Sequence, residues 1–117
     1  MMNNVMLVGR LANDIEKKEL ENGKEVTTIS LAVNRSFKNP DGVYETDFID
    51  CVLWDGLADN IYEYCQKGDV IGVRGRLQVS YYEKDDIKRK VVQVVVEKLT
   101  FLSSRSKEQE EDKEAEE

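Results

Sequence analysis

Hydrophobic and polar residues alternate along five stretches of this chain, and a period of two is typical of a β-strand with one buried face. Between the third and fourth stretches the pattern changes: Leu57, Ala58 and Ile61 recur at helical spacing and predict one short amphipathic helix that ends near Gly68. The five predicted strands are Val5–Leu11, Glu25–Asn34, Thr46–Trp54, Asp69–Tyr82 and Val91–Leu102.

Polar segments and turn residues separate these elements. Ala12–Lys24 is polar and predicts a long loop, while the Asn-Pro-Asp-Gly sequence at Asn39–Gly42 predicts a tight turn. Glu83–Lys90 predicts the tip of a second hairpin. Either Asp55 or Gly56 is expected to cap the helix.

This order of elements predicts an all-β protein with one short helix. Five strands with a helix between strands 3 and 4 match the plan of the OB fold, a five-stranded Greek-key barrel that often binds oligonucleotides. We expect this domain to occupy residues 1–102. Residues 103–117 are rich in Glu and poor in hydrophobic residues, and they predict a disordered acidic tail.

The third predicted strand has two faces of different chemistry. Ile49, Cys51 and Leu53 share one face and suit a core, whereas Phe48 and Trp54 share the other with a carboxylate, that of Asp50. One interpretation is that a second layer of core buries the two aromatic rings. The other is that the rings stack on nucleobases.

Charge and composition exclude several classes of site. The chain has 24 acidic and 17 basic residues, a net charge of −7, which opposes tight phosphate binding. It has no histidine, and Cys51 and Cys65 lack metal-site spacing, so neither a metal site nor catalysis is expected. With no secretion signal or membrane-spanning stretch, we expect a cytoplasmic protein with free thiols.

The fourth predicted strand adds cations to the aromatic side chains. Arg74, Arg76 and Tyr82 share one face, and basic residues follow in the hairpin tip. Cations for phosphates and aromatic rings for bases suit a groove for a single strand, although a solvated strand face also carries charge.

Several motifs, in order, resemble bacterial single-stranded DNA-binding proteins and together cover nearly all of residues 3–102. The matching motifs are NNVMLVGRL at Asn3–Leu11, ISLAVNRSFKNPDG at Ile29–Gly42, ETDFIDCVLW at Glu45–Trp54, LADNIYEYCQKGDVIGVRGRLQ at Leu57–Gln78, and VVQVVVEKLTFL at Val91–Leu102.

The resemblance implies single-stranded DNA binding in replication, recombination and repair, without a cofactor. It also implies a homotetramer, or else a dimer, with the N-terminal strand in the dimer interface. The implied base-stacking residues are Phe37, Phe48, Trp54 and Tyr82. The implied phosphate contacts are Arg10, Arg35, Lys38, Arg74, Arg76, Lys84, Lys88 and Arg89.

Two departures from the family pattern lower the expected affinity for DNA and for partner proteins. Asp55 and Gly56 follow Trp54, where many relatives carry basic residues. The tail ends in EEDKEAEE and lacks the Pro-Phe tip that docks repair proteins in the family, so we do not expect that docking.

Other functions remain open at this level. The acidic body favours an OB-fold protein–protein adaptor of the primosome type, whereas retention of all four aromatic residues favours DNA. Stacking also tolerates RNA. A metal-dependent nuclease is disfavoured, because Asp47 and Asp55 do not share a strand face with Asp50.

Overall fold

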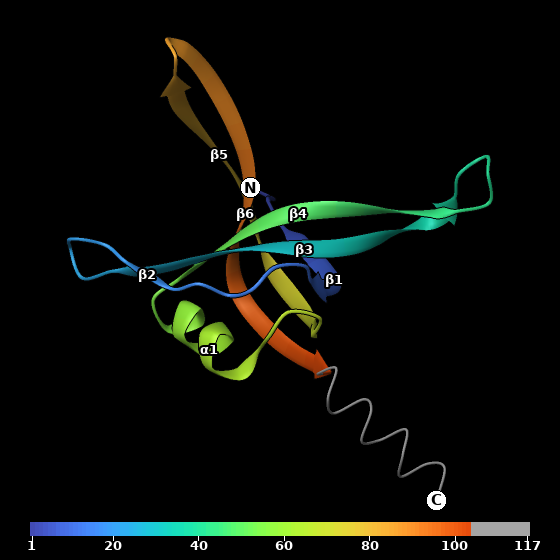
Figure 1. Ribbon diagram of the computed structural model, residues 1–117, viewed down its shortest axis with the longest axis horizontal. Helices are drawn as coiled ribbons and strands as arrows, with labels where there is room; N and C mark the ends of the chain where they lie inside the picture. Colours follow the sequence, from blue (N-terminus) through green and yellow to red (C-terminus); the bar gives the residue numbers. More distant parts are fainter. Residues whose placement is uncertain (104–117) are drawn as a thin grey trace, which may run out of the picture.

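The computed structural model describes residues 1–103, and the predicted acidic tail lies outside the described residues except for Ser103 (Figure 1). The elements are β1 (Val5–Leu11), β2 (Lys18–Glu19), β3 (Glu25–Lys38), β4 (Tyr44–Trp54), α1 (Gly56–Tyr64), β5 (Val70–Lys84) and β6 (Ile87–Ser103).

The five long strands close into a barrel, as predicted. The sheet order is β1-β5-β6-β4-β3-β2, and β1 also pairs with β3, which closes the ring. Within residues 1–103 all pairings are antiparallel except that of β4 with β6, where Cys51 lies opposite Val94 and Val52 opposite Val95. Helix α1 lies at one end of the barrel (Figure 1). It has nine residues and is too short to cross a membrane.

The prediction of a loop over Ala12–Lys24 was wrong in one detail, because the segment contains a short strand. Lys18 and Glu19 form β2 and pair with Val26 and Glu25 at the start of β3. Counting this strand places the helix between β4 and β5, rather than between strands 3 and 4. A two-residue exposed strand contains too little hydrophobic alternation to be recognised in a sequence.

The core draws on all five long strands and the helix. The largest fully buried apolar side chains are Leu11, Ile29, Leu31, Leu53, Ile61, Ile71 and Val94. Cys51 is buried in this core, and Cys65 follows the last residue of α1; both are free thiols. Burial raises the pKa of Cys51 to about 12 and that of Cys65 to about 11.

Two long hairpins, β3–β4 and β5–β6, project from the barrel in different directions (Figure 1). In β5, Leu77, Val79 and Tyr81 continue the alternation of the buried Ile71 and Val73, but they are exposed because this part of the strand has left the barrel.

The tip of the β5–β6 hairpin is tighter than predicted. Instead of a loop over Glu83–Lys90, the ladder continues to the pair Lys84 and Ile87. Asp85 and Asp86 form a two-residue turn with φ values of 54° and 63°. Both signs of φ match the type I′ turn, whose twist fits a tight antiparallel hairpin.

Two glycines lie where strands approach closely. A Cβ atom on Gly9 would overlap the carbonyl oxygen of Ala32, and one on Gly75 would overlap the carbonyl oxygen of Val95. The register of β5 with β6 also shifts between Arg74 and Gly75. A side chain at either glycine would therefore push apart two strands that close the barrel.

The junction between β4 and α1 settles which residue caps the helix. Asp55 is the N-cap residue, with φ 49° and ψ −117°, and Gly56 is the first helical residue. The Asp55 carboxylate makes no cap hydrogen bond; it accepts one from the backbone N–H of Glu25 at 3.1 Å. The backbone N–H of Asp55 donates to the Glu25 carbonyl at 2.8 Å. These two bonds fix the end of β4, and with it Trp54, against the start of β3.

Candidate nucleic-acid interface

Phe48 and Trp54 lie on the outer face of β4. Phe48 is 66% exposed and Trp54 39% exposed, so the interpretation that a second core layer buries both rings was wrong. Of the residues sharing this face, only Val52 is buried, and it lies beside Val95 of β6. The barrel wall thus presents two flat rings to solvent on one strand, about 20 Å apart at strand spacing.

Phe48 and Arg10 line one hollow on this outer surface. The hollow measures about 490 Å³ and lies where β1 passes beside β3. One guanidinium nitrogen of Arg10, Nη1, donates to the carbonyl oxygen of Gly68 at 2.8 Å, which anchors the side chain at the rim. A predicted stacking ring and a predicted cation therefore share one concave surface.

The same hollow contains two polar residues that the sequence did not single out. Asn34 and Thr46 are directly opposite each other in the β3–β4 ladder, and the Thr46 hydroxyl donates to Asn34 Oδ1 at 2.7 Å. The predicted turn at Asn39–Gly42 could have indicated that Asn34 and Thr46 lie close together, because a hairpin pairs residues on either side of its turn.

Phe37 lies near the end of the β3–β4 hairpin and is 64% exposed. Phe37 continues the alternation of the buried Ile29 and Leu31, so a regular ladder would place it on the core side of β3. The register of β3 with β4 shifts between Asn34 and Lys38, so the ladder is irregular at Phe37. Lys38 lies beside it, with its ammonium 5.6 Å from the centre of the Tyr44 ring.

Arg35 lies on the opposite face of the same hairpin from Phe48. Its guanidinium donates to both carboxylate oxygens of Asp47, at 3.1 and 3.0 Å, and to Glu45 at 2.6 Å. Because side chains alternate along β4, Glu45 and Asp47 point away from the face that holds Thr46 and Phe48. Arg35 is therefore not grouped with Phe48, and two carboxylates engage its guanidinium.

This ion pair predicts a pH dependence of stability. Hydrogen bonding to Arg35 lowers the pKa of Asp47, so the stabilisation is present above the unfolded pKa and is lost as pH falls through the lower, folded pKa. Relative to an Asp47→Asn variant, the wild type should thus lose stability in acid, below about pH 4. Urea midpoints at pH 7 and pH 3 measure this difference.

The control is Asp41→Asn, in the exposed turn of the same hairpin. Asp41 forms no ion pair within residues 1–103, so its variant should track the wild type at both pH values. Equal behaviour of the Asp41 and Asp47 variants would contradict the assignment.

The remaining predicted residues lie on β5 and on its hairpin with β6. Arg74 lines a separate hollow of about 520 Å³ beside Met6 and Lys98. Arg76 donates to Gln78 Oε1 at 3.0 Å. Tyr82 is exposed near the tip and lies directly opposite Arg89 in the ladder, with Lys84 on the same face. Lys88 lies opposite Glu83 on the other face, where its ammonium is 4.8 Å from the centre of the Tyr81 ring.

The two hairpins do not bring all these residues together. Tyr82 and the tip cations belong to the β5–β6 hairpin, which points away from the β3–β4 hairpin that carries Phe37 (Figure 1). The predicted residues are therefore spread over the barrel wall and both hairpins, rather than gathered in one compact pocket.

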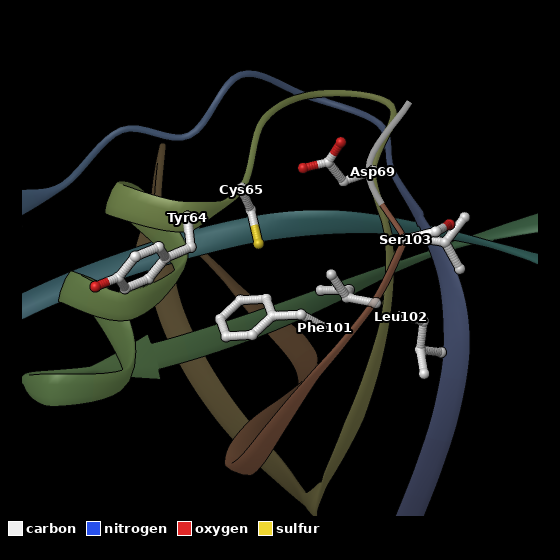
Figure 2. A pocket seen from close by; sticks show the side chains of 8 residues that line it. Tyr64, Cys65, Asp69, Phe101, Leu102 and Ser103 are labelled. Atoms are coloured by element: carbon white, nitrogen blue, oxygen red, sulfur yellow. The ribbon is translucent and has the colours of Figure 1, made fainter. Parts of the chain in front are cut away.

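A third hollow lies elsewhere, at the end of α1 and β6 (Figure 2). Its volume is about 460 Å³, and its walls include Tyr64 and Phe101, whose rings meet edge to face at 6.0 Å. Cys65 and Asp69 line its rim. No predicted stacking or phosphate-contacting residue lines this pocket.

Comparison with known proteins gives one consistent family. A family profile described as the single-strand binding protein family matches residues 2–102. A single-stranded DNA-binding protein of Bacillus cereus is 48% identical over 91% of this chain and 63% of that protein. Single-stranded DNA-binding protein B of Bacillus subtilis is 41% identical over 92% of this chain and 96% of that protein.

A solved structure extends the likeness to the whole barrel. The structure described as a Plasmodium falciparum SSB complex with ssDNA superposes with a TM-score of 0.80 at 27% identity, covering 88% of this chain and 96% of that one. The closed barrel, the order of its strands and these sequence relationships agree, and the chain belongs to the single-strand binding protein family.

Proposed function

We propose that this protein binds single-stranded DNA without strong sequence dependence and without catalysis. The observation that carries the proposal is the exposure of Phe48 and Trp54 on one face of β4, in a chain of this family. Aromatic rings stack on any base, because every base has a flat face. The relatives above are named for single-stranded DNA binding, and the solved neighbour is described as a complex with ssDNA. The acidic composition favours the protein–protein adaptor, but neither these relatives nor the solved neighbour adds support for it.

The binding track runs over four aromatic side chains and their neighbouring cations. The stacking residues are Phe37, Phe48, Trp54 and Tyr82. The phosphate contacts are Arg10, Lys38, Arg74, Arg76, Lys84, Lys88 and Arg89. Arg35 is left out, because Asp47 and Glu45 engage its guanidinium on the other face of the hairpin.

The active form is a homo-oligomer, a tetramer or else a dimer, that serves replication, recombination and repair in the cytoplasm. Strand β1 supports an assembly: Val5–Gly9 pair with β5 on one edge and with no strand on the other edge within residues 1–103. Met6 and Val8, also on β1, are large exposed apolar residues. An open strand edge with apolar side chains suits pairing with a second copy.

Fluorescence of the single tryptophan tests the proposed function. Titration with oligo-dT should quench Trp54 emission in a saturable way, because a base stacks on its ring. Raising the salt concentration should weaken binding, with a log–log slope of about −0.7 for each phosphate contact.

A fluorescein-labelled oligo-dT gives an independent readout by anisotropy in the same samples. If the protein shows neither quenching nor an anisotropy change at low salt, it does not bind single strands. Binding by anisotropy without quenching would instead show that Trp54 lies outside the contact surface.

A further inference from the structure

Asp50 lies between the two exposed rings of β4. It is two residues from Phe48 and four from Trp54 on the same strand face, about 7 and 13 Å along the strand. Asp50 is exposed, and its carboxylate makes no hydrogen bond or ion pair within residues 1–103. A charged group thus occupies the middle of the proposed stacking face.

The strand beside Asp50 leaves room for a base. Directly opposite in β3 is Ser30, flanked on the same face by Thr28 and Ala32, and all three side chains are small. Large side chains on this part of the ribbon therefore come from β4 alone. A base stacked on Phe48 has space to lie over β3 with its edge near the Asp50 carboxylate.

Asp50 also differs from the next carboxylate along the strand. Asp47 points to the opposite face and pairs with Arg35 through two hydrogen bonds. Its carboxylate is paired with a guanidinium that Glu45 shares, and it lies away from the proposed DNA track. Asp50 has no such partner within residues 1–103 and faces the track, where a bound strand would meet its carboxylate.

An ionised carboxylate can only accept hydrogen bonds. In a single strand the Watson–Crick edges are open to such contacts. Guanine offers two adjacent donors on that edge, its ring N–H and its amino group, which match the two oxygens of a carboxylate. Adenine and cytosine offer one amino group each, and thymine offers only a ring N–H between two carbonyl oxygens that the carboxylate repels.

We propose that Asp50 reads the edge of a stacked base and gives this protein a preference for guanine over thymine within single-stranded DNA. This inference rests on the proposed function and deepens it. The charge of Asp50 also repels the phosphates of every strand equally, so affinity for all single strands is lower than the aromatic residues alone would give.

The experiment compares two labelled oligonucleotides of equal length by anisotropy. One is oligo-dT, and the other carries a guanine at every fourth position, a spacing that prevents four-stranded guanine structures. The wild type should bind the guanine-containing strand more tightly, on the order of fivefold, the low end of the discrimination given by a bidentate base contact.

Three variants locate the effect. Asp50→Ala and Asp50→Asn should bind both strands equally well and should bind oligo-dT more tightly than the wild type at low salt. Glu63→Gln removes one exposed carboxylate from α1, outside the track, and should keep the guanine preference. Melting curves of all variants should coincide, because both sites are exposed.

Equal affinity of the wild type for the two strands would overturn the proposal, as would a guanine preference that survives in both Asp50 variants. In either case oligo-dT binding is intact, and the proposed function stands. If the wild type binds neither strand, the proposed function and this inference fall together.

Discussion

Replacing Trp54 with alanine is expected to weaken binding to oligo-dT by about 1–3 kcal/mol, which is roughly 5- to 150-fold in Kd. Trp54 is partly exposed at the end of β4, and its loss removes a stacking platform without opening the core. The fold should therefore survive, and the melting temperature should stay within a few degrees of the wild type. Anisotropy of a labelled oligonucleotide measures the affinity, since the variant has no tryptophan signal.

Two further variants separate stacking from general disturbance. Trp54→Phe keeps a ring at the same place and should recover most of the affinity. Tyr62→Ala removes an exposed ring from α1, off the proposed track, and should leave binding unchanged. A large drop in the melting temperature of Trp54→Ala would show that the indole supports the core, and unchanged affinity would show that no base stacks there.

Replacing Gly75 with alanine is expected to destabilise the barrel by about 3 kcal/mol or more, at the upper end of the cost of overpacking. The new Cβ atom would overlap the carbonyl of Val95, which is backbone and cannot rotate away. The strands β5 and β6 would have to separate where their register already shifts. For a domain of about 100 residues this corresponds to a fall of about 12 °C or more in Tm.

Gly72 provides a matched control on the same strand. A Cβ atom there would lie 3.6 Å from the nearest side-chain atom, an ordinary contact, so Gly72→Ala should change stability by less than about 1 kcal/mol. Thermal melts of the two variants at one protein concentration give the comparison. Similar melting temperatures for both variants would contradict this prediction. They would show that the β6 backbone moves aside for a Cβ atom at position 75 at little cost in stability.

The alternation of residues was sufficient to predict the barrel, because each long strand has one face in a shared core. Ile29 and Leu31 in β3 and Ile71 and Val73 in β5 are buried as the pattern indicates. The pattern failed where strands leave the barrel: Leu77 continues it but has no core beneath it. Strand length beyond the barrel depends on turn geometry, which alternation does not encode.

The candidate site was predictable in its residue types but only partly in its grouping. The alternation around Phe48 and Trp54 placed both rings on one face, and both are exposed. The placement of Arg35 was not predictable, because its partners Glu45 and Asp47 reach it only through hairpin pairing. A cation near an aromatic residue in sequence can point to the other side of a two-stranded ribbon.

The burial of Cys51 and the partial burial of Cys65 have a practical consequence for labelling. With pKa values of about 12 and 11, Cys51 and Cys65 hold almost no thiolate at neutral pH, and thiolate is the form that attacks maleimides. A cysteine introduced at an exposed position, such as Asp41 in the hairpin turn, would then react far faster than either native thiol. A dye could be placed beside the proposed track without first removing the native cysteines, one of which fills the core.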